Sequence, residues 1–158
     1  LAEALRHEVL ESARRTPRFL KQMALNALAR GTPLNWLGGI DTDERGTVDL
    51  KLQGAAIFVD AARLYSLAHG ISATGTRERL ESVGARIGLA SAEYEAWVGG
   101  FEFLQLLRLR HQLEGADVDE APNRVRVTDL NDIDRRILKE SFRLARQLQQ
   151  RLQLDYER

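Results

Sequence analysis

Charged residues interrupt two otherwise apolar segments of this chain, and they are the residues best suited to chemistry. In the first segment, Asp60 and Arg63 stand three positions apart, which places them on one face of a helix. A charged pair inside a buried helix is costly unless a partner satisfies it. The best partner in the sequence is the second apolar segment, Phe101 to Glu114. We therefore expect these two helices to enclose a polar layer.

The second apolar segment carries a polar stripe of its own, made of Glu102, Gln105, Arg108, His111 and Gln112. Guanidinium groups bind carboxylates and phosphates through paired N–H donors. One interpretation is an anion-binding floor in which Arg63, Arg108 and Arg110 act as donors. The other is a buried network of salt bridges that fixes helix register, which is the commoner role of such groups. His111 taken alone is more typical of a satisfied core histidine than of a base.

Two short polar runs flank the first apolar helix. Asp49 and Lys51 precede it, and an alternating strand explains them as well as a binding role does. Thr74 and Thr76 precede the next helix, where free N–H groups and hydroxyls could bind phosphate. No glycine-rich phosphate loop surrounds them, so a helix cap formed by Thr76 is the simpler interpretation.

Other kinds of catalytic and metal site have little support. The three histidines form no i, i+4 pair, and the chain has no cysteine, which removes thiolate ligands and nucleophiles. Paired carboxylates can hold two magnesium ions. The pattern Asp-x-Asp occurs at Asp41/Asp43, Asp117/Asp119 and Asp132/Asp134, but none of these pairs follows a strand with a phosphate-binding turn. We expect no metal site in this chain.

Helical periodicity predicts the elements that must position these groups. Gly70 is expected to end the first apolar helix, and Asn131 to cap the last helix. Apolar runs around the polar turn DTDERG favour a small β-hairpin within residues 34–51. The expected fold is an all-α antiparallel bundle of about six helices. Five lie near residues 2–15, 17–30, 53–69, 77–87 and 92–114, and the last begins after Asn131 and continues at least to Leu152.

Length and charge narrow the class of protein. The 158 residues suit a single domain spanning 1–158, and their formal net charge of zero gives no general attraction to nucleic acid or a membrane. No apolar run is long enough for a membrane span, and the absence of cysteine fits a cytoplasmic location. Because the chain begins at Leu1 rather than at methionine, we expect it to be cut from a longer protein.

Two groups of residues together carry a family resemblance. The first contains Asp49-Leu50-Lys51, Gly54, Asp60-Ala61-Ala62-Arg63, Ala68-His69-Gly70-Ile71, Thr74, Thr76 and Arg79-Leu80. The second contains Phe101-Glu102-Phe103-Leu104 and Leu107-Arg108-Leu109-Arg110-His111-Gln112. This pattern resembles the nucleotidyltransferase substrate-binding domain. That domain is the helical C-terminal part of bacterial proteins related to the uridylyltransferase that modifies the PII signalling protein.

The resemblance implies a non-catalytic domain that helps a neighbouring nucleotidyltransferase domain hold its nucleotide or protein acceptor. Magnesium and a nucleoside triphosphate would belong to that catalytic domain, whose Gly-Ser and Asp-x-Asp pattern maps onto nothing in this chain. Further implied partners are CBS or cyclic-nucleotide-binding sensor domains of the same chain, and a homodimer is compatible. The matching positions for substrate binding are Asp49, Lys51, Asp60, Arg63, Arg108, Arg110 and His111. The alternative is a structural or docking module without a ligand, in which the central charges only fix helix packing.

Overall fold

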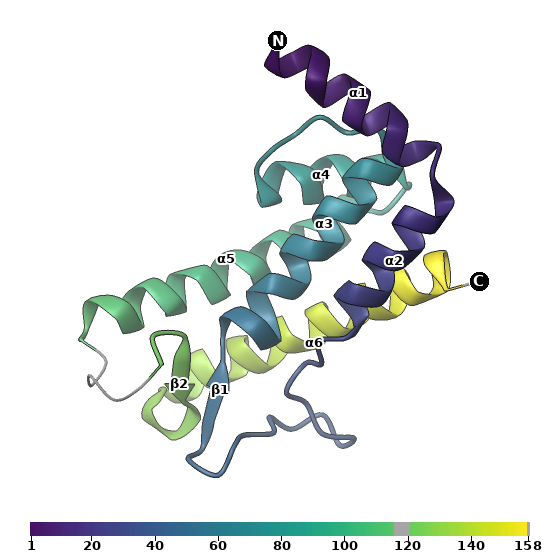
Figure 1. Ribbon diagram of the computed structural model, residues 1–158. Coiled ribbons are helices and arrows are strands. Elements are labelled where there is room, and N and C mark those ends of the chain that lie inside the picture. Colours follow the sequence, from purple (N-terminus) through teal and green to yellow (C-terminus); the bar gives the residue numbers. More distant parts are fainter. Residues whose placement is uncertain (116–120, 158) are drawn as a thin grey trace.

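The computed structural model describes residues 1–115 and 121–157. Six α-helices lie in this part of the chain, so the expected all-α fold is confirmed (Figure 1). None of these helices is long and apolar enough to cross a membrane. Their bounds are α1 Ala2–Arg14, α2 Pro17–Leu28, α3 Ala56–His69, α4 Thr76–Arg86, α5 Ser91–Leu113 and α6 Asp132–Tyr156.

Local sequence signals explain several helix ends. Pro17 opens α2, where its missing N–H costs nothing. Gly70 follows α3 with φ of 66°, the left-handed conformation that glycine adopts without strain. The Oδ1 atom of Asn131 accepts a hydrogen bond of 2.8 Å from the backbone N–H of Asp134, so Asn131 caps α6 as predicted.

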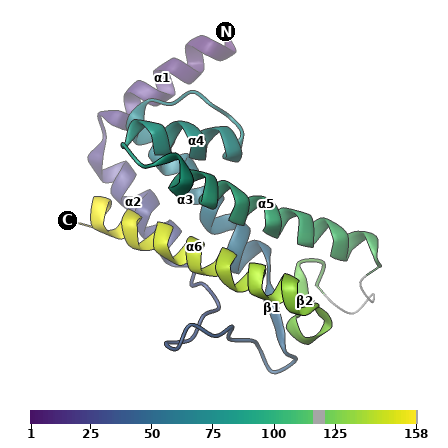
Figure 2. The same cartoon turned by 180° about the vertical axis from the view of Figure 1, so that it is seen from behind.

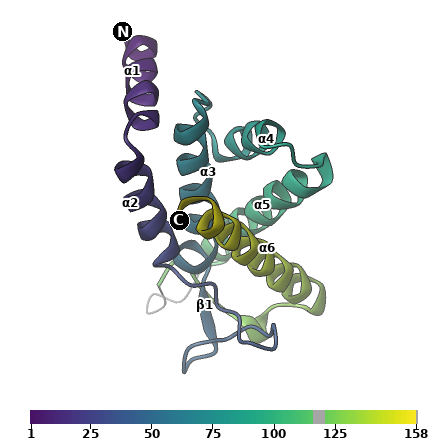
Figure 3. The same ribbon diagram turned by 90° about the vertical axis from the view of Figure 1, so that its right-hand side faces the viewer.

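The helices pack around α3, which contacts α1, α2, α4 and α6. Helices α5 and α6 run side by side in opposite directions, as two opposite views show (Figures 1 and 2). The view from the side shows α1 extending away from the other helices at the N-terminal end (Figure 3). Thus α3 is the interior helix that the sequence predicted.

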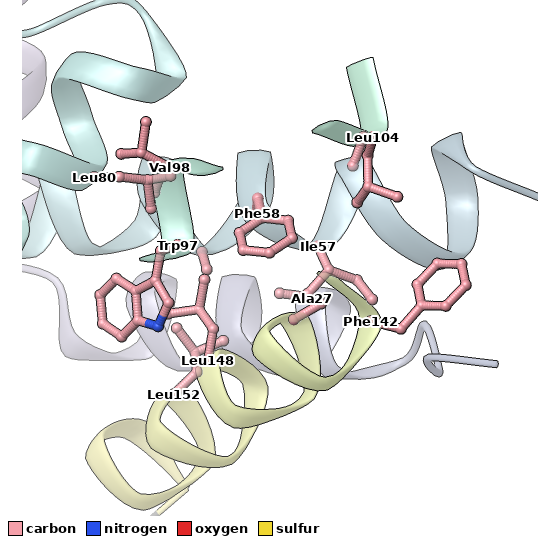
Figure 4. Close-up of a cluster of buried hydrophobic side chains, with 14 of the residues drawn as sticks. Ala27, Ile57, Phe58, Leu80, Trp97, Val98, Leu104, Phe142, Leu148 and Leu152 are labelled. Atoms are coloured by element: carbon pink, nitrogen blue, oxygen red, sulfur yellow. The ribbon is translucent and has the colours of Figure 1, made fainter. Parts of the chain in front are cut away.

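Large apolar side chains from α3, α5 and α6 form the core. Phe58, Leu104 and Phe142 are fully buried, and Figure 4 shows side chains of the three helices pointing toward one another. Burying a side chain of this size contributes about 1.5–3 kcal/mol. These contacts fix the positions of α3 and α5, which carry most of the candidate site residues.

A two-stranded antiparallel sheet closes one end of the bundle. Strand β1 (Thr47–Asp49) pairs with β2 (Arg124–Arg126), so that Asp49 lies opposite Arg124. The extended segment near residue 48 was predicted, but its partner comes from the segment before α6 and not from residues 34–46. Those residues contribute an isolated bridge between Leu34 and Ile40. The sheet therefore joins two distant parts of the sequence.

Candidate functional site

Asp49 organises the turn between β1 and the bundle. Its Oδ1 atom accepts hydrogen bonds from the backbone N–H groups of Lys51 and Leu52 at 3.0 and 2.7 Å. Its own N–H donates to Oε1 of Gln53 at 2.9 Å, an exchange that resembles a capping box. Asp49 is buried, whereas Lys51 is exposed. The carboxylate is thus occupied within the fold, and its effect is to hold the turn that places Lys51 at the surface.

A π-helical turn, η1 (Lys51–Ala55), connects this turn to α3 and lies directly against the core. A Cβ atom on Gly54 would lie 2.9 Å from Cδ1 of Leu104 and 3.1 Å from Cε1 of Phe142. Only glycine therefore permits this approach to α5 and α6 without a shift of the neighbours. Close packing therefore explains why glycine stands at position 54 of the segment that carries the family resemblance. π-Helical turns of this kind are frequent at functional sites.

Asn123 connects η1 to α5. Its carbonyl oxygen accepts a hydrogen bond of 2.9 Å from the N–H of Leu50, and its Oδ1 accepts one of 3.0 Å from Nε of Arg108. A second donor of Arg108 bonds Oε1 of Gln105. The structure thus brings together residues that lie far apart in the sequence. We name Asp49, Lys51, Arg108 and Asn123 the sheet-end site.

Within the described residues, no carboxylate neutralises the two cations of the sheet-end site. In the part of the chain that the structure describes, Arg108 donates only to neutral amide oxygens, those of Asn123 and Gln105. Among residues 1–115 and 121–157, neither Lys51 nor Arg108 forms a salt bridge with a carboxylate. An arginine and a lysine without counter-charges are chemically suited to bind a phosphate group or a carboxylate.

The neighbouring arginine, Arg124, does have a counter-charge. Its Nη1 lies 3.0 Å from Oδ2 of Asp43 and also donates to the hydroxyl of Thr47. Hydrogen bonds from the hydroxyl and then the backbone N–H of Thr47 hold the pKa of Asp43 below its ordinary value. Arg124 and Asp43 therefore fasten the loop before β1 to β2, and they line a cavity of about 450 Å³ there.

Arg110 and His111 lie elsewhere, beside the beginning of α6. Arg110 forms a salt bridge of 2.9 Å with Asp134, and Nε2 of His111 is buried with no hydrogen-bond partner among the described residues. Both line a cavity of about 320 Å³ that also contains Glu114 and Asp129. The carboxylates make this cavity a poor site for an anion.

The prediction of a polar layer between the two apolar helices is wrong. Asp60 forms a salt bridge of 2.9 Å with Arg30, which follows α2, and Arg63 is exposed. The buried side of α3 is formed by its apolar residues, including Ile57, Phe58, Ala61, Leu64 and Tyr65. The charged face of α3 is consequently turned toward α1 and α2, and α5 does not supply its partner.

The remaining acidic and hydroxyl candidates have local roles. Within the described residues no group of three or more histidines and carboxylates could hold a metal ion. Asp132 pairs with Arg135 in the first turn of α6. Thr76 is the first residue of α4 and forms no side-chain cap; Gly75 occupies the cap position, so the predicted Thr76 cap is wrong. The Asp117/Asp119 pair lies outside the described residues.

Comparison with known families decides how this arrangement is classified. The model of the family described as "Putative nucleotidyltransferase substrate binding domain" matches residues 17–156. The chain belongs to this family. The match spans α2 to α6 with the sheet-end site, and leaves α1 outside. Comparisons with curated proteins and with solved structures gave no match.

Asn123 was not predicted from the sequence, although it connects η1 to α5 at the sheet end of this nucleotidyltransferase substrate-binding domain. Asn123 stands in a polar stretch without periodicity, between Pro122 and the arginines of β2. Its importance arises only from the pairing of β1 with β2, which brings its backbone to Leu50 and its side chain to Arg108. No signal in the sequence specifies that pairing.

Proposed function

We propose that this domain is a non-catalytic accessory of a nucleotidyltransferase domain in the same chain, and that its sheet-end site holds the phosphate groups of the nucleotide. The observation that carries the proposal is the pair of cations, Lys51 and Arg108, for which the described residues supply no carboxylate partner. Arg108 bonds the side chain of Asn123, and Lys51 directly follows Leu50, whose N–H bonds the carbonyl oxygen of Asn123. Membership in the substrate-binding family supports the same role.

The chemistry of the site fits a phosphate better than a neutral group. A hydrogen bond to a charged partner contributes about 1.5–3 kcal/mol net, so two cations give a usable but modest affinity. Arg108 is held by two amides, which reduces the entropy lost when it binds. In this proposal the catalytic domain supplies magnesium and the remaining contacts to the nucleoside triphosphate. The sensor domains and the protein acceptor contact other surfaces, and the whole protein acts in cytoplasmic signalling.

The test is steady-state kinetics of the full-length protein carrying Lys51→Ala or Arg108→Lys. We expect each variant to raise KM for the nucleotide about tenfold, which corresponds to about 1.4 kcal/mol of lost binding. The second variant keeps the charge and removes the planar donor geometry. Arg136→Ala, which removes an exposed arginine from α6, is the control and should leave KM unchanged. Unaltered KM in both site variants, with folding intact, would refute the proposal.

A docking role is the second candidate, and exposed apolar side chains on α5 favour it. Leu106, Leu109 and Leu113 are 56%, 53% and 78% exposed, and their spacing places them near one face of the helix. In this alternative that face contacts the sensor domains or a second protomer. Leu109→Gln would then weaken the domain contact or the dimer, measured by analytical ultracentrifugation, without changing KM for the nucleotide.

A further inference from the structure

A third cavity, separate from the sheet-end site, lies between α1, α3 and the loop that precedes α4. Its volume is about 330 Å³, and three arginines line it: Arg6 from α1, Arg63 from α3 and Arg79 from α4. Figure 1 shows α1, α4 and the C-terminal end of α3 together at the end of the bundle opposite the sheet. Arg63 lies 12 positions beyond Lys51, which corresponds to roughly 18 Å along a helix axis.

No described residue balances the positive charge in this cavity. No aspartate or glutamate belongs to its described lining. Within the described part of the chain, Arg6 and Arg63 form no hydrogen bond or salt bridge, and Arg79 donates only to the carbonyl oxygen of Ala73 at 2.8 Å. Burial, followed by the charges of Arg63 and Arg6, lowers the pKa of Arg79 from its ordinary value. Three guanidinium groups that repel one another would be stabilised by an anion placed between them.

A buried hydroxyl provides an independent observation at the same place. Ser66 lines the cavity and is only 2% exposed, yet its Oγ has no hydrogen-bond partner among the described residues. Leaving a buried hydroxyl unpaired is costly, and native proteins rarely tolerate it without a reason. A ligand oxygen in the cavity would supply the missing partner.

The remaining wall of the cavity is mostly apolar and includes Leu10, Leu67 and Ile71, with Ser72 and Thr74 as its polar members. An inorganic anion alone would leave this wall uncovered, whereas an apolar group attached to the anion would bury it. We propose that the cavity binds a small organic phosphate. Arg6, Arg63 and Arg79 bind the phosphate group, Ser66 hydrogen-bonds one of its oxygens, and the wall covers the organic part.

Helix α1 forms part of the cavity wall but is not part of the family domain. Arg6 and Leu10 come from α1, which lies outside the residues matched by the family. The organic phosphate would therefore bridge α1 and the family domain, and its binding would hold α1 against α3. This site goes beyond the proposed nucleotide role of the sheet-end site and does not depend on it.

The test is isothermal titration of the 158-residue chain with phenyl phosphate, which combines a phosphate group with an apolar ring. We expect saturable binding that is at least about tenfold tighter than that of phenol or inorganic phosphate. Arg63→Ala should weaken the binding of phenyl phosphate at least about tenfold, and Ser66→Ala should weaken it without lowering stability in urea.

Two controls separate this site from other parts of the molecule. Arg18→Ala removes an exposed arginine from α2 and should not change the affinity for phenyl phosphate. Lys51→Ala should not change it either, so the result stands apart from the outcome at the sheet-end site. Absence of saturable binding to the unmodified chain, or equal affinity in folded Arg63→Ala, would overturn the proposal.

Discussion

Replacing Gly54 with alanine tests how η1 is held against the core and, through it, how Lys51 is positioned. The added Cβ would lie 2.9 Å from Cδ1 of Leu104, closer than such atoms pack. Overpacking of this kind costs about 1–3 kcal/mol. Alanine is also a better helix former than glycine by about 0.5–1 kcal/mol, so the net loss of stability is smaller than the clash itself.

A double-mutant cycle isolates the clash from helix propensity. Leu104→Ala alone should cost about 2–5 kcal/mol, because Leu104 is fully buried and leaves a cavity. In the double variant, the new methyl group of residue 54 occupies part of that cavity. The stability loss of the double variant should therefore be smaller than the sum of the two single losses by about 1–3 kcal/mol, measured as free energies of unfolding in urea. The contact of 3.1 Å with Phe142 remains, so recovery should be incomplete.

Gly99→Ala is the matched control on α5. A Cβ on Gly99 would have nothing within 4 Å, and the residue is exposed. This substitution should stabilise the domain by about 0.5–1 kcal/mol through helix propensity alone. A close contact between Gly54 and Leu104 is ruled out if Gly54→Ala stabilises the domain as the control does. It is also ruled out if the effects of Gly54→Ala and Leu104→Ala are additive within about 0.5 kcal/mol.

Two further predictions concern the acidic residues. The folded-state pKa of Asp43 lies below the ordinary value of 3.8, so its carboxylate stabilises the fold above that pH, and this contribution is lost as the pH falls through the folded-state pKa. The stability difference between the unmodified chain and Asp43→Asn, followed by urea unfolding, should therefore be present at neutral pH and vanish in strong acid; a gap that persists there would contradict the assignment. Asp60→Asn should cost about 0.2–1 kcal/mol, because the side chains of Asp60 and Arg30 are 28% and 43% exposed. A loss of about 3–5 kcal/mol in the same measurement would instead indicate a buried pair.

The bundle was predictable from sequence because its signals are local. Pro17, Gly70 and Asn131 each define a helix end through their own backbone or side-chain chemistry. Residues 57–67 are apolar around most of the helix circumference, which predicted an interior helix, and α3 is that helix. These properties depend on neighbours within one or two turns.

The candidate site was predictable only in part because it depends on contacts across long sequence separations. The periodicity of α3 placed Asp60 and Arg63 on one face, as expected, but could not say which helix that face meets. Similarly, Arg108 was a candidate from its polar stripe, whereas its partner Asn123 became apparent only from the sheet. The residue types thus indicated anion binding, and the tertiary fold decided which cations have no carboxylate partner among the described residues.

Nucleotide binding at the sheet-end site is tested most directly by thermal unfolding of the 158-residue chain with and without the magnesium complexes of ATP and UTP. A ligand that binds only the folded state raises stability by about 2.7 kcal/mol at 100 times its dissociation constant. We expect at least one nucleotide to stabilise the unmodified chain. This stabilisation should be abolished in Lys51→Ala and Arg108→Lys and retained in Arg63→Ala. Absence of stabilisation by both nucleotides, or a shift that survives in Lys51→Ala and Arg108→Lys, would contradict the assignment of the nucleotide to the sheet-end site.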